Sequence, residues 1–238
     1  MASRTFVLIA GSWHGAWCWR KIVPLLEARG HRVLTPELPA TGADHTDPAS
    51  ITLESWARFV ADIVSATAPA VLVGHSRGGL VISRAAELAP ESVQRLVYVS
   101  GYLLPAGGTV AEAARSDHDS LVPPNMIPAV AGVTCRLRDS AIREALFGQC
   151  TDEDYEYARA RLSPEPLKPL VTPLKITEQG FGRIPRAYLE CAQDRTITLA
   201  AQRRMQSALP CAPVLTLDSD HSPFFSNPEP LARWLGGL

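Results

Sequence analysis

A serine lies inside a short segment framed by glycines, Gly74-His75-Ser76-Arg77-Gly78. The apolar run 70–73 before it predicts a buried strand, and the pattern over 79–89, which stops before Pro90, predicts a helix. A G-x-S-x-G segment between a strand and a helix is typical of the tight turn that exposes a nucleophilic serine. We expect strained backbone dihedrals at Ser76, with the two glycines keeping other side chains away from the turn. The segment therefore predicts acyl transfer through Ser76.

The base and the acid that such a serine needs follow later in the chain. A neutral serine is a weak nucleophile, so a general base must take its proton. His221 comes after the last expected strand, 212–217, and can return that proton to the leaving group. Asp194 comes just after the expected strand 184–192, where a carboxylate can hold the imidazole of His221. The order Ser76, Asp194, His221 is the one expected of an α/β-hydrolase.

Other positions for the acid are less favourable. Asp218 and Asp220 are rivals, but they are too near His221 in sequence to approach its ring from behind easily. Some α/β-hydrolases place the acid after the strand that follows the nucleophile helix. In this chain that position is Ser100-Gly101-Tyr102, which offers no carboxylate. We therefore expect Asp194 to be the acid.

An oxyanion hole requires two backbone N–H groups aimed at the developing negative charge. We expect one from Arg77, directly after the nucleophile, and one from Ser12 in the loop after the first strand. His14 in that loop is a candidate for a second catalytic histidine, but we interpret it as a residue that orders the loop. The Arg77 side chain is expected to pair with a carboxylate of an inserted cap; the alternative is that it reaches a substrate anion.

The elements around these residues alternate between strands and helices. This alternation predicts a parallel sheet that is covered on both faces. The expected strands are 5–10, 31–36, 70–73, 95–100, 184–192 and 212–217. One expected helix ends near residue 28, and the others span 52–68, 79–89 and 230–238.

The alternation breaks between about 103 and 184. This region carries two charged helix candidates, 139–148 and 151–162, and a proline-dense run over 164–173, with no convincing buried strand. Because structureless loops of this length are uncommon in compact domains, we expect a small cap. The predicted domains are a core formed by 1–102 and 185–238, and a cap insertion at 103–184.

Composition limits the class of protein. The 238 residues are 46% hydrophobic and 20% charged, with a formal net charge of −1 and no basic block, which argues against a nucleic-acid partner. No stretch approaches the roughly 20 apolar residues of a membrane helix, so we expect no membrane partner. The five cysteines are scattered without C-x-x-C or metal-ligand spacing, so no metal site is predicted. We expect a cytoplasmic protein with reduced thiols.

The residues also carry a resemblance to a known family. The segment 11–19, Gly-Ser-Trp-His-Gly-Ala-Trp-Cys-Trp, is similar to the H-G-x-x-H-G-x-W-x-W segment of plant methylesterases and hydroxynitrile lyases. The stretches 24–31 and 42–44, the triplet Gly74-His75-Ser76, the cap-like 162–166, Asp194 and the pair Asp220-His221 match in the same order. This resemblance spans nearly the whole chain. It implies an α/β-hydrolase fold, with a mostly parallel central sheet, helices on both faces and a small inserted cap, acting without a cofactor.

Four positions depart from the family pattern. One is Arg77, where many relatives have a small or apolar residue after the nucleophile. The leading histidine of the family's H-G is Ala10 here. The hydroxynitrile lyases hold the charge of cyanide with a lysine after the catalytic histidine, and that position is Ser222. They also use a threonine at the position of Gly11. Without these two residues, ester hydrolysis is the favoured activity.

The function predicted from these observations is that of a serine carboxylesterase, which hydrolyses small to medium apolar esters through an acyl-enzyme. A cofactor-free hydroxynitrile lyase-like enzyme and a non-catalytic ligand-binding α/β-hydrolase are the alternatives. The expected partner is a small-molecule ester, and a homodimer is left open. Under the resemblance, the pocket lies between the nucleophile turn and the cap, and its apolar lining suits an apolar acyl or aryl ester. The candidate lining residues are Trp13, Leu103, Met126, Ile127, Phe147, Phe181 and Phe224.

Overall fold

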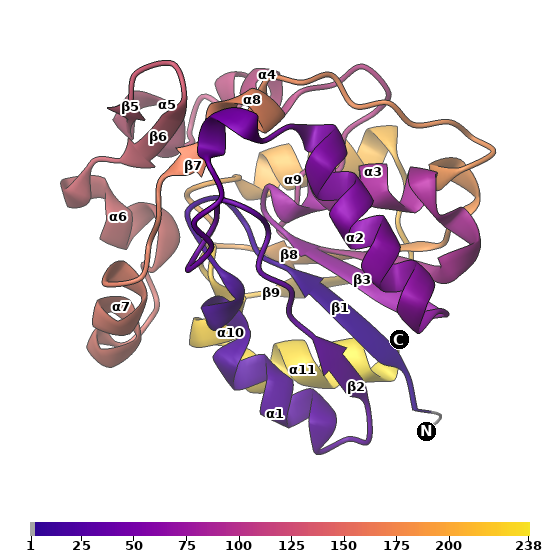
Figure 1. Ribbon diagram of the computed structural model, residues 1–238. Coiled ribbons are helices and arrows are strands. Elements are labelled where there is room, and N and C mark those ends of the chain that lie inside the picture. Colours follow the sequence, from indigo (N-terminus) through magenta and orange to yellow (C-terminus); the bar gives the residue numbers. More distant parts are fainter. Residues whose placement is uncertain (1–2) are drawn as a thin grey trace.

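The computed structural model describes residues 3–238, so that positions 1–2 of the predicted core lie outside the described residues. A six-stranded sheet in the order β2-β1-β3-β4-β8-β9 forms the centre, and every neighbouring pair in it is parallel (Figure 1). The predicted fold class is confirmed. The strands are β1 (Thr5–Ile9), β2 (Arg32–Leu34), β3 (Ala70–His75), β4 (Val93–Val99), β8 (Arg186–Cys191) and β9 (Val214–Leu217).

The sheet separates two hydrophobic cores. Successive side chains of a strand point to opposite faces. In β1, Val7 and Ile9 therefore pack into one core, and Phe6 and Leu8 pack into the other. The helices α2 (Leu53–Thr67), α3 (Gly78–Leu88) and α9 (Leu199–Ala208) contribute to the first core, and α1 (Ile22–Glu27) and α11 (Pro228–Gly237) contribute to the second (Figure 1).

The start of α2 shows how local sequence sets an element. Thr52 accepts a hydrogen bond from the Ser55 N–H at 3.0 Å, and the Ser55 hydroxyl accepts one from the Thr52 N–H at 3.0 Å. This reciprocal cap satisfies two N–H groups that a helix start leaves unpaired. The predicted helix over 52–68 is confirmed.

The segment between β4 and β8 builds a smaller layer above the carboxyl edge of the sheet (Figure 1). It contains a three-stranded antiparallel sheet in the order β5-β6-β7, whose strands have the bounds Met126–Val130, Thr134–Leu137 and Glu165–Pro166. The expectation of no buried strand is wrong for β6, in which three of four residues are buried. A strand of four residues is too short to show a periodic pattern. The helices are α4 (Val110–Arg115), α5 (Val122–Asn125), α6 (Asp139–Leu146), α7 (Asp152–Arg159) and α8 (Leu167–Leu170).

The helices α6 and α7 match the two predicted charged helices, whereas the exact division of the chain at 103 and 185 stays a prediction. Short 3-10 helices complete the chain: η1 (Ala16–Lys21), η2 (Pro48–Ser50), η3 (Pro90–Ser92), η4 (Phe181–Arg183), and a single-turn helix α10 (Pro223–Ser226).

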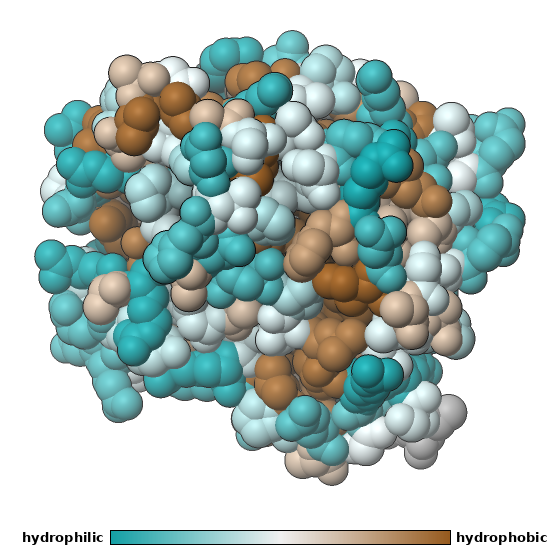
Figure 2. Space-filling model, viewed as in Figure 1, coloured by the Kyte–Doolittle hydropathy of each residue, from teal (hydrophilic) through white to brown (hydrophobic). Residues whose placement is uncertain are grey.

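The surface in Figure 2 is mostly polar, with apolar residues gathered in a band in the lower half of this face, near the edge strand β2. Within residues 3–238, no helix is both long enough and apolar enough to cross a membrane.

Candidate active site

Ser76 lies in the turn between β3 and α3, with a φ of 52°. This left-handed conformation is uncommon for a residue with a side chain, and it confirms the strain expected at the turn. The flanking glycines have a steric reason. A Cβ at Gly74 would lie 2.6 Å from the carbonyl carbon of Gly78, and a Cβ at Gly78 would lie 2.7 Å from the carbonyl oxygen of Ile9. The turn therefore closes only with glycine at both positions.

His221 and Asp194 are in direct contact. The Nδ1 atom of His221 lies 2.7 Å from Oδ2 of Asp194, and both side chains are buried. His221 follows β9 and Asp194 follows β8, two neighbouring strands of the parallel sheet. The carboxyl ends of parallel strands meet at one edge, and this is why residues 27 positions apart in the chain come together. Within residues 3–238 no hydrogen bond joins Ser76 Oγ to His221, a contact that often tightens only when substrate is bound.

Three further donors hold the Asp194 carboxylate. The Thr196 and Ile197 N–H groups donate to Oδ1 at 2.6 and 2.9 Å, and the Ser100 hydroxyl donates to Oδ2. These bonds fix the orientation of the carboxylate. Ser100 and Thr196 were not predicted. Ser100 directly follows β4, and this position at the carboxyl edge of the sheet is the signal that could have found it.

The two rival carboxylates face other partners. Asp220 accepts from the Gln149 N–H at 2.9 Å and from the Ser226 hydroxyl at 2.7 Å, and Asp218 accepts from the Gln193 side chain at 2.9 Å. In the described part of the chain, neither carboxylate bonds to the His221 ring. Asp194 is thus the carboxylate that this geometry offers to the imidazole.

The expected oxyanion donors, Ser12 and Arg77, lie in the loops that follow two neighbouring strands. Ser12 follows β1 and Arg77 begins the turn into α3, and β1 pairs with β3. Among residues 3–238, neither backbone N–H donates to another protein atom, so both stay free for a substrate oxygen. Gly11 leaves the room for this approach, because a Cβ there would lie 2.7 Å from the Cβ of Ser76.

Two other histidines of the site, His14 and His75, form hydrogen bonds to backbone carbonyls. His14 Nδ1–H donates to the Ser12 carbonyl at 2.8 Å, which confirms the interpretation that His14 orders its loop. His75 Nε2–H donates to the His221 carbonyl at 2.8 Å, and the two rings lie 4.5 Å apart. Burial lowers the pKa of His14 to about 3, opposed by the bond to Ser12, and burial lowers the pKa of His75 well below its usual range. Both rings are therefore neutral in the folded protein.

This neutrality predicts a loss of stability in mild acid. The pKa of His14 is 6.5 in the unfolded chain and about 3 in the folded one, so below pH 6.5 the unfolded chain binds a proton that the folded protein does not. We expect the free energy of unfolding to fall by about 1.4 kcal/mol per pH unit for each such group. Urea unfolding at pH 7.0, 6.0 and 5.0 measures this slope.

The matched variants for that measurement are His14→Asn and His118→Asn. His118 is exposed, so its replacement is expected to leave the slope unchanged, whereas His14→Asn is expected to reduce it. A wild-type free energy of unfolding that stays constant over this range would contradict the neutral assignment of His14 and His75.

The Arg77 side chain is buried and paired with a carboxylate. Its Nε lies 2.8 Å from Oε1 of Glu165, both side chains are fully buried, and its guanidinium lies 4.4 Å from the ring centre of Trp56. Glu165 belongs to β7 in the inserted segment, so the predicted pairing with a cap carboxylate is confirmed. Glu165 itself is a residue that the sequence analysis did not single out.

A cavity of about 270 Å³ opens at Ser12 and Ser76, beneath the inserted segment. Its walls are mostly apolar. Trp13 and Met126 line it as predicted. Further lining residues, which were not predicted, are Tyr102, Val110, Ala111 and Ala114, Val122 and Pro123, and Leu167 and Leu170.

The other five predicted lining residues lie elsewhere. Phe147, Phe181 and Phe224 are buried in the two hydrophobic cores, and Phe224 packs against the rings of Trp19 and His75. Leu103 is likewise a core residue, and Ile127 is not among the residues around this cavity. Apolar periodicity alone does not separate core residues from lining residues, because both are buried and apolar. We leave these five out of the proposed substrate site.

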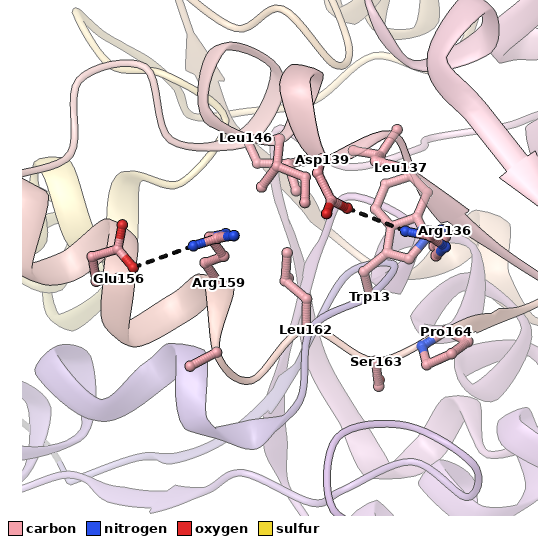
Figure 3. A pocket seen from close by; sticks show the side chains of 12 residues that line it. Trp13, Arg136, Leu137, Asp139, Leu146, Glu156, Arg159, Leu162, Ser163 and Pro164 are labelled. Carbon is pink, nitrogen blue, oxygen red and sulfur yellow. Dashed lines mark hydrogen bonds and ion pairs between the residues drawn. The ribbon is translucent and has the colours of Figure 1, made fainter. Parts of the chain in front are cut away.

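Trp13 also lines a second cavity, of about 400 Å³ (Figure 3). Leu137 and Leu146 line it together with Trp13, and ion pairs stand at its rim. The pairs are Arg136 with Asp139 at 3.1 Å and Arg159 with Glu156 at 3.6 Å (Figure 3). Trp13 therefore contributes to the walls of both cavities. No cluster of three or more metal-ligating side chains occurs in the described residues.

Comparisons with known proteins agree with the observed fold. The sequence profile of the "Alpha/beta hydrolase family" matches residues 6–234. Methylesterase 7 of Arabidopsis thaliana is 30% identical over 98% of this chain and 95% of its own length. Pyrethroid hydrolase of Sphingobium wenxiniae is 31% identical over 98% of this chain and 86% of its own length.

Solved structures are similar over the same extent. A pyrethroid hydrolase from Sphingobium faniae superposes with a TM-score of 0.85 at 30% identity, covering 99% of this chain and 97% of the other. A polyneuridine aldehyde esterase mutant superposes with a TM-score of 0.87 at 24% identity, covering 98% of both chains, and this second likeness concerns the fold alone.

Proposed function

The chain belongs to the alpha/beta hydrolase family and is a hydrolase, and on this premise we propose that it is a serine carboxylesterase with Ser76, Asp194 and His221 as its catalytic triad. The observation that carries the proposal is the contact of 2.7 Å between His221 Nδ1 and Asp194 at the sheet edge where the strained Ser76 also lies. A hydroxyl, an imidazole and a carboxylate in these relations are the parts that acyl transfer needs.

The reaction begins when Ser76 Oγ attacks the ester carbonyl. His221 Nε2 takes the hydroxyl proton, and Asp194 holds the imidazole in the tautomer that carries hydrogen on Nδ1. The oxygen of the tetrahedral intermediate receives hydrogen bonds from the Ser12 and Arg77 N–H groups. His221 then protonates the leaving alcohol and the acyl-enzyme forms. Water, deprotonated by His221, releases the acid and restores Ser76.

The cavity supports a substrate of limited size. Its volume of about 270 Å³ and its mainly apolar walls fit small to medium apolar esters. Tyr102 is a polar group in the wall, and burial raises its pKa, so its hydroxyl stays protonated and neutral. The natural substrate class is thus an ester whose acyl or alcohol part is apolar, and no group in this proposal requires a cofactor.

The alternative lyase activity lacks a charge for cyanide. Ser222, next to His221, is fully buried and offers a neutral hydroxyl, and Pro223 has no backbone N–H. A threonine in place of Gly11 would place its Cβ 2.7 Å from Ser76. The Arg77 guanidinium could have replaced a lysine, but it is buried and paired with Glu165. An ester oxyanion stays covalently bound to carbon and needs only the two N–H groups.

A substrate panel tests the proposal. We expect release of p-nitrophenol from p-nitrophenyl acetate and butyrate and hydrolysis of apolar methyl esters, and no release of cyanide from mandelonitrile or acetone cyanohydrin. The wild-type protein and Ser76→Ala are assayed side by side. Cyanide release faster than ester cleavage would contradict the esterase assignment, and binding of esters without turnover would favour a ligand-binding protein.

The expected cytoplasmic location, the absence of nucleic-acid partners and a homodimer stay predictions.

A further inference from the structure

The loop that carries the Ser12 N–H is held by the inserted segment. The Trp13 N–H donates to Glu165 Oε2 at 3.1 Å, and the Trp13 carbonyl accepts from the Ser163 N–H at 3.0 Å. The indole N–H of Trp13 donates to the Cys135 carbonyl at 3.3 Å. Trp13 has a φ of 63°, a conformation that a bulky residue adopts only when its surroundings impose it. The loop geometry therefore depends on contacts from outside the loop.

Arg77 holds the peptide on the other side of Ser12. Its Nη2 donates to the Gly11 carbonyl at 3.0 Å, while its Nε donates to Glu165 Oε1 at 2.8 Å. The Gly11 carbonyl and the Ser12 N–H belong to one planar trans peptide, so they point in opposite directions. Anchoring the carbonyl oxygen to Arg77 thus fixes the direction of the Ser12 N–H. If this peptide turned over, a carbonyl oxygen would replace the N–H donor.

We propose that Arg77 and Glu165 are positioning residues that set the oxyanion hole by fixing the two peptide planes on either side of Ser12. This inference rests on the proposed esterase function. Arg77 holds the Gly11–Ser12 peptide and Glu165 holds the Ser12–Trp13 peptide. The backbone N–H of Arg77 is the second oxyanion donor. Arg77 therefore supplies one donor with its backbone and orients the other with its side chain. The inserted segment, through Glu165, completes this arrangement.

A purely stabilising role is a weaker account of this pair. Both side chains are fully buried, and a buried ion pair is often no more stable than an apolar pair of similar size, because both charges lose their hydration. Charge-assisted hydrogen bonds are, however, short and directional, which suits the orientation of a peptide plane. In this protein, Arg77 and Glu165 each make such a bond to the backbone of the oxyanion loop.

The test compares two variants with a matched control. In Glu165→Gln, the single amide oxygen can serve Arg77 or Trp13 but not both, and the amide NH2 faces the remaining donor. In the double variant Arg77→Met with Glu165→Met, no buried charge is left unpaired, so this protein is expected to fold. The control is Asp154→Asn, which breaks another contact between core and inserted segment: the buried Asp154 pairs with the partly exposed Arg20 at 3.0 Å and Lys21 at 2.6 Å.

We expect both test variants to lose about 100-fold in kcat on p-nitrophenyl acetate, as removal of one oxyanion donor does, with KM within about threefold of wild type. Asp154→Asn is expected to keep the wild-type kcat. A second readout is inhibition by a trifluoromethyl ketone, which forms a tetrahedral oxyanion on serine. Its Ki should rise in parallel with the loss of kcat/KM, while the Ki of a product acid stays constant.

The outcomes separate the two proposals. If wild type hydrolyses no ester, the proposed function fails. If wild type is active and the folded double variant keeps its kcat and its trifluoromethyl ketone affinity, the positioning role is overturned. Failure of both test variants to fold, by circular dichroism, would assign the pair to stability and would also overturn it.

Discussion

Replacement of Ser76 by alanine is expected to lower kcat for ester hydrolysis by about 10⁶-fold, because no other group in the site can form the acyl-enzyme. Ser76 lines the cavity, and its strained φ of 52° holds its side chain at the carboxyl edge of the sheet. Alanine tolerates the same backbone, so the melting temperature should change little. Initial rates on p-nitrophenyl acetate, with active-site titration of the wild type, measure the loss.

The control for this prediction is Ser207→Ala, at an exposed serine of α9, which should keep full activity. An organophosphonate should label wild type once, and mass spectrometry should place the adduct on Ser76. Near-wild-type turnover by purified Ser76→Ala, or an adduct on another residue, would refute the serine mechanism.

Asp194→Asn is expected to lower kcat by about 10⁴-fold, the effect of holding a triad histidine in the wrong tautomer. The asparagine amide would present a donor or a neutral oxygen to His221 Nδ1, in place of the carboxylate oxygen now at 2.7 Å. The imidazolium formed during the reaction would also lose its counter-charge. kcat and KM on p-nitrophenyl acetate measure the effect, and KM should change far less than kcat.

Asp218→Asn and Asp220→Asn are the comparison variants. Asp218 contacts Gln193 and lies at the surface, so its variant should keep its activity. Asp220 is buried among Gln149, Ser222 and Ser226, so its loss should reduce stability more than kcat. A crippling effect of either variant together with a mild effect of Asp194→Asn would show that the acid is assigned to the wrong residue.

Motifs with local physical causes could be predicted from the sequence. The G-x-S-x-G turn requires glycine at Gly74 and Gly78 for steric reasons, so its presence between an apolar strand and a helix indicated the conformation of Ser76. The cap of α2 at Thr52 is equally local. The proximity of the loops after β8 and β9 could be predicted from the alternation of strands and helices, because parallel strands bring their carboxyl ends to one edge of the sheet. The sequence alone therefore predicts the pairing of Asp194 with His221.

Contacts between distant segments could not be predicted in this way. Four of the five candidate lining residues that the structure places elsewhere are buried in the cores, and Ile127 is half-buried. Sequence pattern does not distinguish burial in a core from burial beside a cavity. The strand β6 was missed because four residues carry no readable period. Thr196 and Glu165 were missed because a single polar residue has no signal until its partner is known, whereas Ser100 has one in its position directly after β4.

The sequence by itself determined the parallel α/β fold, the strained position of Ser76 and the order of the groups around it, because each depends on neighbours within one or two elements. Only the tertiary structure decided how the site is held. It placed Ser100 on Asp194, turned Asp220 away from His221, and brought Glu165, 88 positions after Arg77, into contact with it. Such long-range contacts depend on how the inserted segment packs on the sheet edge, and this packing is a property of the whole chain.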